Sequence, residues 1–344
     1  MKKILVVNIG GLGDMLFSVP FLRGLRAKHK FAEITLLTVT NSYDIIKNQN
    51  YFNKVVEFPA GTKDIRSFFA YKYLRMLLAL RKEKYDILIN LRTVVSLSSS
   101  IKTGVMLFIL GAKKNYGRGN PGTTLFYDAA VVEKRSLKKH EVDYHAELAD
   151  KLGFKPLGKI DIKLEKSNYE FASKFLVKNR IGSKTKFIVI NQEARWETKR
   201  WPLSNYIELM EKLEKLKGIR ILLLSSKDVA SEQIIKKIFK KVVLLKDVNI
   251  NNIAAVIKKA KVLLTNDTGV IHVGAALNVK TVGLYGPSDS FLTGPCLLPS
   301  RKIVFSKNVD CAPCNKLECS SMKCFKEISV EEVYCAIIKL LGVK

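Results

Sequence analysis

Residues 262–287 read VLLTNDTGVIHVGAALNVKTVGLYGP, and this stretch decides the fold class. Its first residues, Val262–Thr265, form a short apolar run typical of a buried parallel strand. A helical pattern then begins at Thr268, and a second apolar run, Thr281–Leu284, follows it. Strand, helix and strand in this order predict a βαβ unit with parallel strands.

Polar residues lie where the first of these strands ends. In βαβ units, ligands bind at the carboxyl ends of the strands, where helix N-termini offer N–H groups to phosphates. We therefore predict a nucleotide site at Asp267, Thr268, Gly269 and His272. The alternative is that Asp267 and Thr268 only cap the helix.

Predicted strands and helices alternate through most of the chain, in two runs. The first run begins with the strand Lys3–Asn8, and the second begins with the strand Phe187–Asn191, after a looser stretch near residue 160. This alternation predicts an α/β protein with two Rossmann-like domains facing across a cleft. We expect the domains at 1–165 and 166–328, and a final helix within 329–344 that can pack back across the first domain.

The net charge of +28 over 344 residues is large. Such a charge suits contact with anionic lipid, nucleic acid or phosphorylated ligands, or reflects a Lys-rich surface without a specific role. Lysines are scattered along the chain and are not gathered in one arm, and no helix-turn-helix, zinc-finger or RNP motif is present. Nucleic acid is therefore not an expected partner.

Neither a signal peptide nor a transmembrane helix is predicted. The apolar run Ile4–Val7 ends at Asn8 and the glycines after it, with no cleavage site. The nearest candidate for a span, Val94–Leu110, contains Lys102 and three consecutive serines. We expect a cytoplasmic protein whose basic surface allows peripheral contact with the cytoplasmic face of an anionic inner membrane.

A glycine-rich turn follows the first strand. Gly10, Gly11 and Gly13 allow a tight turn and a close approach of a ligand to the backbone, and Asp14 stands in the first turn of the next helix. A dinucleotide site would have an acidic residue at the end of the second strand, but Glu33 precedes that strand. This absence argues against NAD. Asp14 is either a carboxylate presented to the site or only a helix-start residue favoured by the dipole.

A third polar segment, residues 191–202, follows the first strand of the second domain. It contains both tryptophans of the chain and the cations Lys199 and Arg200. A Lys and an Arg at the carboxyl end of a strand can neutralise a diphosphate without a metal. The alternative is a solvated basic loop in which Trp201 is packed as a plug.

Taken in order, these segments resemble the heptosyltransferases of glycosyltransferase family 9, the bacterial ADP-heptose:lipopolysaccharide transferases. The resemblance extends almost from end to end. It rests on Lys3-Ile4-Leu5 through Gly11-Leu12-Gly13-Asp14, Thr198-Lys199-Arg200-Trp201-Pro202, Asn266-Asp267-Thr268-Gly269 with His272, Tyr285-Gly286-Pro287 and Thr293-Gly294-Pro295.

The resemblance implies a GT-B architecture, with the acceptor in the N-terminal domain and a nucleotide sugar in the C-terminal one. It also implies an inverting, metal-independent transfer, with ADP-heptose as donor and a lipopolysaccharide-core or related glycolipid as acceptor. By the same resemblance Asp14 is the general base, Lys199 binds the diphosphate, and Thr198 and the segment from Asp267 to His272 bind the donor.

Two departures from the family concern the donor. Gln192-Glu193 stand where the family often has a small pair such as Pro-Gly, and the acid that holds the donor ribose is either Glu232 or Asp228.

The expected mechanism follows from what glycosyl transfer requires. A carboxylate that takes the acceptor proton contributes roughly 10²–10⁴-fold. Lys199 and the N–H groups of Thr268 and Gly269 would stabilise the departing nucleoside diphosphate. No DxD pair stands at a strand end to bridge a Mg²⁺ ion, and Asp247-Val248-Asn249 is not an equivalent, so no catalytic metal or cofactor is expected.

Four of the six cysteines lie within fourteen residues, at Cys311, Cys314, Cys319 and Cys324. In a reducing compartment this C-x2-C-x4-C-x4-C spacing is compatible with a structural Zn²⁺ or iron–sulfur site, with transient disulfides, or with reduced thiols. None of these states is needed for transfer.

Three other functions are compared with this prediction. A sugar-nucleotide epimerase of similar fold would need a carboxylate and a histidine over the donor, as Asp14 and His272 could supply. A dehydrogenase is not favoured, because no acidic residue at the end of the second strand could hold the ribose of NAD. A non-catalytic polyanion-binding protein would explain the charge but not the ordered motifs.

Overall fold

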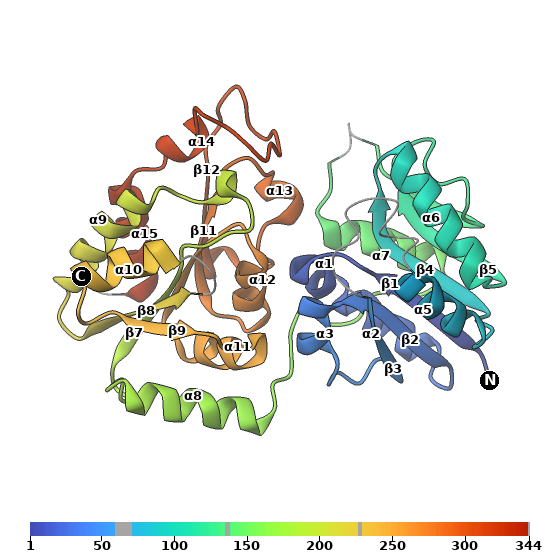
Figure 1. Ribbon diagram of the computed structural model, residues 1–344, viewed down its shortest axis with the longest axis horizontal. Coiled ribbons are helices and arrows are strands. Elements are labelled where there is room, and N and C mark those ends of the chain that lie inside the picture. The colour runs from blue at the N-terminus through green and yellow to red at the C-terminus, as the bar shows by residue number, and fades with distance from the viewer. Residues whose placement is uncertain (59–70, 135–137, 226–228, 343–344) are drawn as a thin grey trace. The chain divides into compact units, whose positions relative to one another are not determined.

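The computed structural model describes residues 1–58, 71–134, 138–225 and 229–342, and it divides into two compact units. The first unit is Met1–Ile160 and the second is Asp161–Lys344 (Figure 1). Each unit is one parallel six-stranded sheet with helices around it. The division falls a few residues before the expected boundary at 165/166.

The sheet of the first unit has the strand order β3-β2-β1-β4-β5-β6. Its central strand β1 pairs in parallel with β2 and with β4, with Ile4 opposite both Ile34 and Ile87. This is the Rossmann order, in which the chain reverses direction beside the first strand and opens a crevice at the carboxyl edge. The strands are β1 (Lys3–Asn8), β2 (Glu33–Val39), β3 (Lys54–Phe58), β4 (Ile87–Val94), β5 (Lys114–Gly119) and β6 (Ala129–Val132).

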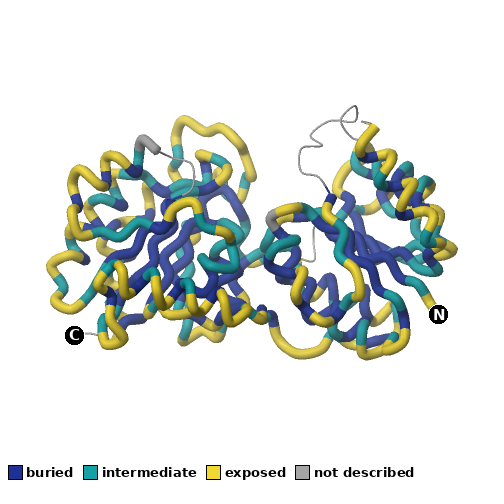
Figure 2. The backbone as a smooth tube through the Cα atoms, turned by 60° about the horizontal axis from the view of Figure 1, so that its bottom comes forward, coloured by how far each residue is buried: buried dark blue, intermediate teal, exposed yellow. Residues whose placement is uncertain are grey.

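Helices cover both faces of this sheet because its strands are apolar on both sides (Figure 2). The helices are α1 (Leu12–Phe17), α2 (Val19–Lys28), α3 (Thr40–Ile46), α5 (Tyr71–Arg81), α6 (Leu97–Leu110) and α7 (Glu141–Lys151). The pattern from Asp14 to Lys28 predicted one helix, but the structure has two, α1 and α2, which meet at Ser18. Pro20 in the first turn of α2 explains the new start, since proline is tolerated there and not in a helix interior.

The second unit repeats the same topology, with the strand order β12-β11-β10-β7-β8-β9. Its strands are β7 (Lys186–Asn191), β8 (Ile219–Ser225), β9 (Val243–Lys246), β10 (Val262–Asn266), β11 (Lys280–Tyr285) and β12 (Lys302–Ser306). Its α-helices are α8 (Lys166–Lys178), α9 (Leu203–Glu214), α10 (Val229–Ile238), α11 (Ile250–Lys259), α12 (Gly269–Ala276), α13 (Ser290–Thr293), α14 (Lys323–Lys326) and α15 (Val330–Leu341). Short 3₁₀ turns lie at Glu197–Lys199 and Pro299–Arg301.

The last helix, expected within 329–344, is α15 (Val330–Leu341). α15 packs against α9, β10 and β11 of the second unit. Its buried face, including Val333 and Ile337, belongs to the same core as Leu264 of β10 and Leu284 of β11. The apolar stripe of α15 is therefore used to close its own sheet.

Several described elements lie outside the predictions made from sequence. These are α3, β3, α6, β5, β6, β12 and the short helices α13 and α14. The segment Val94–Leu110 contains α6, and no helix in the described part of the chain is long and apolar enough to cross a membrane. The predicted helix at 68–82 begins in residues outside the described ranges, and its remainder is α5.

Candidate active site

The carboxyl edge of the second sheet brings together the two charged residues predicted there. Lys199 Nζ lies 2.5 Å from Asp267 Oδ2, and the same oxygen accepts a hydrogen bond of 2.5 Å from Ser288 Oγ. The Lys199 ammonium also lies 5.0 Å from the centre of the Trp196 ring. Asp267 is buried and Lys199 is half-buried, so this ion pair is poorly screened.

The turn between β10 and α12 is built by side-chain hydrogen bonds. Thr268 is the N-cap of α12, and its Oγ1 accepts from the N–H of Val270. Asn191 at the end of β7 donates to Thr265 Oγ1 at 2.9 Å and to Thr268 Oγ1 at 3.1 Å. Thr268 thus has the capping role considered above, whereas Asp267 instead pairs with Lys199.

Asn266 connects this turn to the segment 191–202. Its Oδ1 accepts from the Trp201 N–H at 3.2 Å and from the Tyr206 hydroxyl at 3.0 Å, and its Nδ2 donates to the Gln192 carbonyl at 2.7 Å. Trp201 is buried, and its Nε1 donates to the Ile328 carbonyl at 3.1 Å. These hydrogen bonds hold the segment 191–202 in place beside the site, and the Trp201 side chain is packed in the interior. The segment is therefore not a solvated loop.

The remaining predicted donor residues occupy different positions around this edge. Gly269 and His272 lie in the first turns of α12, and the His272 side chain is buried. The Thr198 hydroxyl donates to the Lys316 carbonyl at 2.8 Å, so it holds the Cys-rich segment against the 3₁₀ turn. Thr198 thus supports the position of Lys199, its neighbour in the chain.

Glu232 lies near the start of α10, next to the end of β8. Its carboxylate accepts from Ser225 Oγ at 3.0 Å and forms ion pairs with Lys236 at 3.2 Å and Lys246 at 2.9 Å. The hydrogen bond from Lys246, with those from Ser225 and Lys236, lowers the pKa of Glu232 to about 2. Asp228, the other candidate for the ribose, lies outside the described residues.

A cavity of about 440 Å³ adjoins the same segment, and Gln192, Thr198, Arg200 and Ser231 are among its lining residues. Lys199 and Asp267 do not line it. The Gln192 side chain is buried, and neither its Oε1 nor its Nε2 has a hydrogen-bond partner among the described residues. A buried amide without partners is costly unless a ligand or water satisfies it, so Gln192 is a candidate ligand contact. The sequence showed Gln192 only as a departure from the family.

The glycine turn of the first unit holds Asp14 in a defined orientation. Asp14 Oδ2 accepts from the Gly11 N–H at 2.7 Å, and a Cβ at Gly10 would lie 2.4 Å from the same oxygen. Buried Asn8, at the end of β1, donates to the Asp14 carbonyl at 3.2 Å. The carboxylate therefore stands at the carboxyl edge of the first sheet, and Gly10 leaves it the room to do so.

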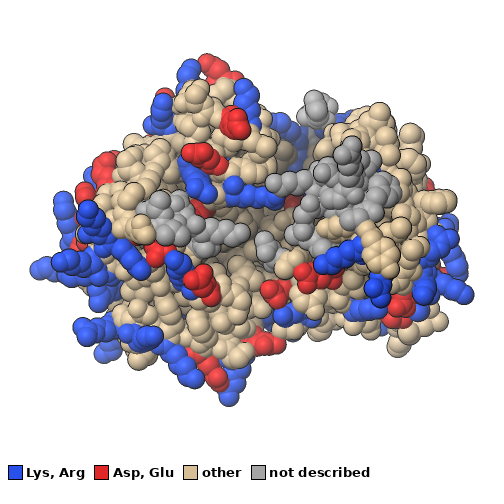
Figure 3. All heavy atoms as spheres, viewed as in Figure 1, with Lys and Arg blue, Asp and Glu red and all other residues tan. Residues whose placement is uncertain are grey.

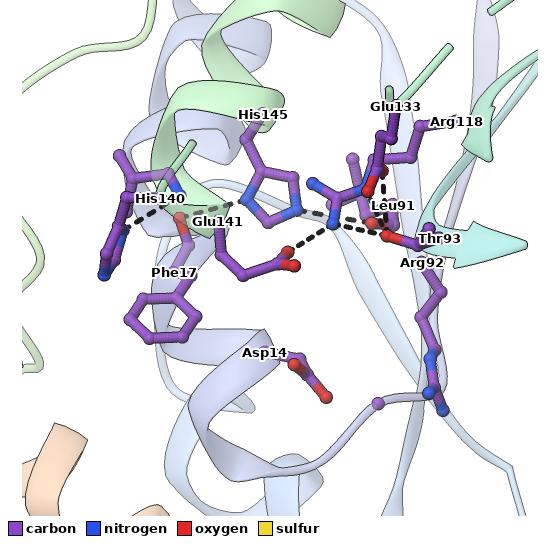
Figure 4. Close-up of polar contacts among 12 residues, drawn as sticks. Asp14, Phe17, Leu91, Arg92, Thr93, Arg118, Glu133, His140, Glu141 and His145 are labelled. Atoms are coloured by element: carbon purple, nitrogen blue, oxygen red, sulfur yellow. Dashed lines mark hydrogen bonds and ion pairs between the residues drawn. The ribbon is translucent and has the colours of Figure 1, made fainter. Parts of the chain in front are cut away.

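A buried ionic network lies at the same edge, and the sequence had not indicated it (Figure 4). Arg118 of β5 forms an ion pair with Glu133 at 3.0 Å, a very short one with Glu141, and a hydrogen bond of 2.7 Å to Thr93 Oγ1. Burial raises the pKa of Glu133 against the opposing effect of Arg118. Among the residues drawn in Figure 4, no hydrogen bond or ion pair joins Asp14 to this network.

His145 of α7 adjoins the network. Its Nδ1 lies 3.3 Å from the Phe17 carbonyl and its Nε2 lies 3.3 Å from the Leu91 carbonyl. Burial, followed by the charge of Arg118, lowers the pKa of His145 to about 3. The imidazole is therefore neutral at physiological pH, and its single N–H can donate to only one of these two carbonyls, which links α7 to either α1 or β4.

A smaller cavity of about 230 Å³ opens beside the glycine turn. Ile9, Arg92, Ser99 and Lys102 are among its lining residues, and none of the described residues that line it is acidic. Arg92 Nη1 reaches the Ile9 carbonyl at 3.5 Å, which places a guanidinium next to the turn that carries Asp14. Two cations and a hydroxyl in one cavity suit an anionic group.

The four clustered cysteines are free thiols in this structure, as are Cys296 and Cys335. Burial and the neighbouring thiols of Cys311, Cys314 and Cys319 raise the pKa of Cys324, so the four lie near one another. No group of three or more His, Cys, Asp or Glu in the described ranges could hold a metal ion. The structure contains no disulfide between these cysteines, and the metal-bound and reduced states both stay predictions.

Comparison with known proteins gives the family. A family model described as glycosyltransferase family 9 (heptosyltransferase) matches residues 73–325. Lipopolysaccharide heptosyltransferase 2 of Escherichia coli K12 is 26% identical over 317 residues, covering 88% of this chain and 87% of that protein. Lipooligosaccharide heptosyltransferase 2 of Campylobacter jejuni serotype O:2 is 26% identical over 339 residues, covering 94% and 93%.

Solved structures share the fold. A family 9 glycosyltransferase from Veillonella parvula superposes with a TM-score of 0.80 at 20% identity, covering 99% of this chain and 97% of that one. The E. coli ADP-heptose lipopolysaccharide heptosyltransferase II gives a TM-score of 0.75 at 21% identity, covering 99% of both chains. The two Rossmann-like units are thus those of the GT-B fold. Together with the family match over most of its length, they establish that the chain belongs to glycosyltransferase family 9, the heptosyltransferases.

Proposed function

We propose that this enzyme transfers a heptose from ADP-heptose to an anionic lipopolysaccharide-core or related glycolipid acceptor, with inversion and without a catalytic metal. The observation that carries the proposal is the position of Lys199, beside Asp267 at the strand edge where α12 begins. The heptose, the ADP and the lipopolysaccharide are proposed by analogy with the related heptosyltransferases.

In the proposed reaction, an acceptor hydroxyl oxygen attacks the anomeric carbon while the bond from that carbon to the diphosphate oxygen breaks. Asp14 takes the proton of the hydroxyl, and ADP leaves with the electron pair. Lys199 stabilises the charge that develops on the diphosphate, since an ammonium in a partly desolvated site is effective there. In the free protein Lys199 pairs with Asp267, so the diphosphate competes with that carboxylate.

The donor is assigned to the second unit. The segment from Asp267 to His272 and Thr198 surround its diphosphate and nucleoside, and Glu232 is assigned to the ribose. The unpartnered amide of Gln192 supports a polar ligand in the adjoining cavity, whose volume of about 440 Å³ is typical of small-molecule sites.

The acceptor is assigned to the first unit. The glycine turn formed by Gly10, Gly11 and Gly13 presents Asp14, and the neighbouring cavity with Arg92 and Lys102 suits a carboxylate or phosphate of the acceptor. A lipid-borne acceptor brings the enzyme to the cytoplasmic face of an anionic membrane as a peripheral protein.

The test is a transfer assay with ADP-heptose and a delipidated core oligosaccharide, with a panel of other nucleotide sugars as controls. We expect a new glycoside of inverted anomeric configuration, formed at the same rate with and without EDTA. Release of an epimerised free sugar without acceptor would instead identify an epimerase. A strict requirement for Mg²⁺ would exclude the proposed donor chemistry.

A further inference from the structure

Helix α6 of the first unit carries an apolar stripe in which Leu97, Ile101 and Phe108 are exposed and Val105 is half-buried. Leu97, Ile101, Val105 and Phe108 follow one another at intervals of three or four residues and therefore lie on one side of the helix. Leu97 is 72% exposed and Phe108 is 82% exposed. The opposite side, with Leu107, is buried in the core, so the second half of α6, residues 104–110, is apolar all round. A surface helix normally has polar residues on its outer side.

Neighbouring segments extend this stripe. Helix α5 packs beside α6 and exposes Tyr71, Leu74 and Leu78. The loop before β6 exposes Leu125, at 83%, and Phe126, whose ring lies 2.7 Å from where a Cβ at Gly104 of α6 would stand. We call this surface the α5–α6 face. Its residues are Tyr71, Leu74, Leu78, Leu97, Ile101, Val105, Phe108, Leu125 and Phe126.

The α5–α6 face joins exposed apolar side chains from two neighbouring helices and a loop. Monomeric proteins expose single apolar residues freely, but contiguous apolar patches on them usually mark a binding surface for a protein or a membrane. In Figure 3 the surface over α6 is mostly tan, whereas Lys and Arg are spread over much of the rest of the visible face.

Within the described segments 71–81 and 87–127, which form the α5–α6 face, the charged residues are Lys and Arg, and Glu83, Asp86 and Asp128 flank these segments. Helix α5 contains Lys72, Arg75 and Arg81 and no acidic residue. The sequence from residue 87 to residue 127 contains no Asp or Glu, although the chain has 31 of them, and it contains five Lys or Arg, of which only Arg118 is buried. Arg81 is held beside the stripe, because its Nη1 donates to the carbonyls of Phe108 and Ile109 at 3.1 and 2.9 Å.

Exposed apolar side chains next to cations favour a lipid bilayer over other partners of the α5–α6 face. Apolar side chains enter the boundary between headgroups and acyl chains, while Lys and Arg attract anionic headgroups. Within these described segments a protein partner would find no carboxylate to specify an orientation. The face also begins where α6 follows β4, close to the cavity with Arg92 and Lys102 at the carboxyl edge of the sheet.

We propose that the α5–α6 face docks the enzyme on a bilayer that contains anionic phospholipids. Docking would hold the acceptor-binding edge of the first unit next to the membrane. The inference rests on the proposed function for a lipid-borne acceptor, but docking itself needs neither donor nor transfer.

The experiment is co-sedimentation with vesicles of phosphatidylglycerol and phosphatidylethanolamine, compared with phosphatidylcholine vesicles, over a range of NaCl concentrations. We expect binding to the anionic vesicles that weakens as salt rises, because the cationic contribution is screened. The variant Phe108→Ser/Leu125→Ser should bind the anionic vesicles at least ~10-fold more weakly, since both side chains lose their apolar insertion.

The matched control is Phe31→Ser, which changes a Phe that is 88% exposed in the turn between α2 and β2 of the same unit. This control should bind vesicles like the unaltered enzyme. Transfer to the delipidated acceptor should be unchanged in Phe108→Ser/Leu125→Ser, which separates docking from catalysis and shows that the variant is folded.

Two results would overturn the proposal. One is equal binding of the double variant and the Phe31→Ser control to anionic vesicles. The other is a dimer in light scattering that the double variant turns into a monomer, with no vesicle binding by the unaltered enzyme. The latter result would make the α5–α6 face an interface between two copies of this chain.

Discussion

The ammonium of Lys199 lies 2.5 Å from the Asp267 carboxylate, although 68 positions separate the two residues in the sequence. The pair forms because β7 and β10 are neighbours in the sheet, so the segments that follow them meet at one edge. A lysine in such a pair is held in place before a ligand arrives. The binding of a diphosphate then requires little ordering of the side chain.

Replacement of Lys199 by Ala is predicted to weaken ADP binding by roughly 10- to 100-fold. The reason is that a charge-assisted hydrogen bond contributes about 1.5–3 kcal/mol, and each 1.4 kcal/mol is tenfold in affinity. Isothermal titration calorimetry with ADP measures this change directly. Unchanged ADP affinity would remove Lys199 from the donor site.

Lys212 provides the matched control for Lys199. It also pairs with a carboxylate, Glu331 at 2.6 Å, and lies 5.7 Å from an aromatic ring, that of Tyr334. We expect Lys212→Ala to bind ADP with the affinity of the unaltered enzyme. A similar loss in both variants would indicate a general effect of charge and not a contact with the diphosphate.

Replacement of Asp14 by Asn is predicted to lower kcat by at least ~10²-fold and to leave ADP affinity unchanged, as expected when a general base is lost. Asn keeps an oxygen that can accept the bond from the Gly11 N–H, so the start of α1 is preserved. Steady-state kinetics of transfer give kcat. Turnover at the normal rate would leave Asp14 with only its role at the helix start.

Asp128 serves as the control for this substitution. Its Oδ2 accepts from the Asn115 N–H at 2.7 Å, the same kind of bond at the same length as that of Asp14. Asn115 stands near the start of β5, at the opposite edge of the sheet from the glycine turn. Asp128→Asn should therefore change kcat little.

The buried central strands and the residues at their ends were predictable from the sequence. A strand buried on both faces is a continuous apolar run, as in Val262–Asn266, and parallel topology then brings its carboxyl end to the ligand-binding edge. The positions of Asp267 and Lys199 at one edge follow from that rule alone. Edge strands such as β3 and β12 are half exposed, so their sequences lack the continuous apolar run that identifies a central strand.

Other features depend on tertiary contacts that no local pattern contains. One ionic network joins three separate segments through Arg118, Glu133 and Glu141. In the sequence, each of these residues alone is typical of a charged residue on the surface. The apolar stripe of α15 indicated that the helix is buried but not which sheet it covers. The orientation of the Gln192 amide is likewise set by its neighbours and not by its sequence.

Acidification is predicted to destabilise the first unit through His145 at pH values where most carboxylates are still ionised. The folded pKa of about 3 lies below the ordinary 6.5, so the unfolded chain takes up a proton that the folded chain does not. The contribution of His145 to the free energy of unfolding is fully present above pH 6.5 and is lost as pH falls toward 3. The loss is about 1.4 kcal/mol per pH unit where only the unfolded state is protonated.

Urea denaturation of the enzyme and of His145→Gln at several pH values between 7 and 4 tests this assignment. Gln does not titrate, so the variant should lose less free energy of unfolding over this range than the unaltered enzyme. Parallel pH dependence in the two proteins would assign the acid sensitivity to other groups.

Cys319 is predicted to react with iodoacetamide faster than Cys335 at neutral pH, although both are exposed. The hydrogen bond from the Ser321 hydroxyl, with backbone N–H bonds from Met322 and Ser321, lowers the pKa of Cys319. Burial and the hydrogen bond to Glu331 raise the pKa of Cys335. Because the thiolate is the nucleophile, the group with the lower pKa is alkylated first.

Mass spectrometry of peptides after short exposure to iodoacetamide gives the order of modification. The variant Ser321→Ala removes the hydroxyl that bonds to Cys319 and should slow its alkylation, while the rate at Cys335 stays the same. If Cys319 resists alkylation until a chelator is added, the cluster holds a metal in solution and the thiols are not free. If Cys335 reacts first, the hydrogen bonds at Cys319 do not control its reactivity.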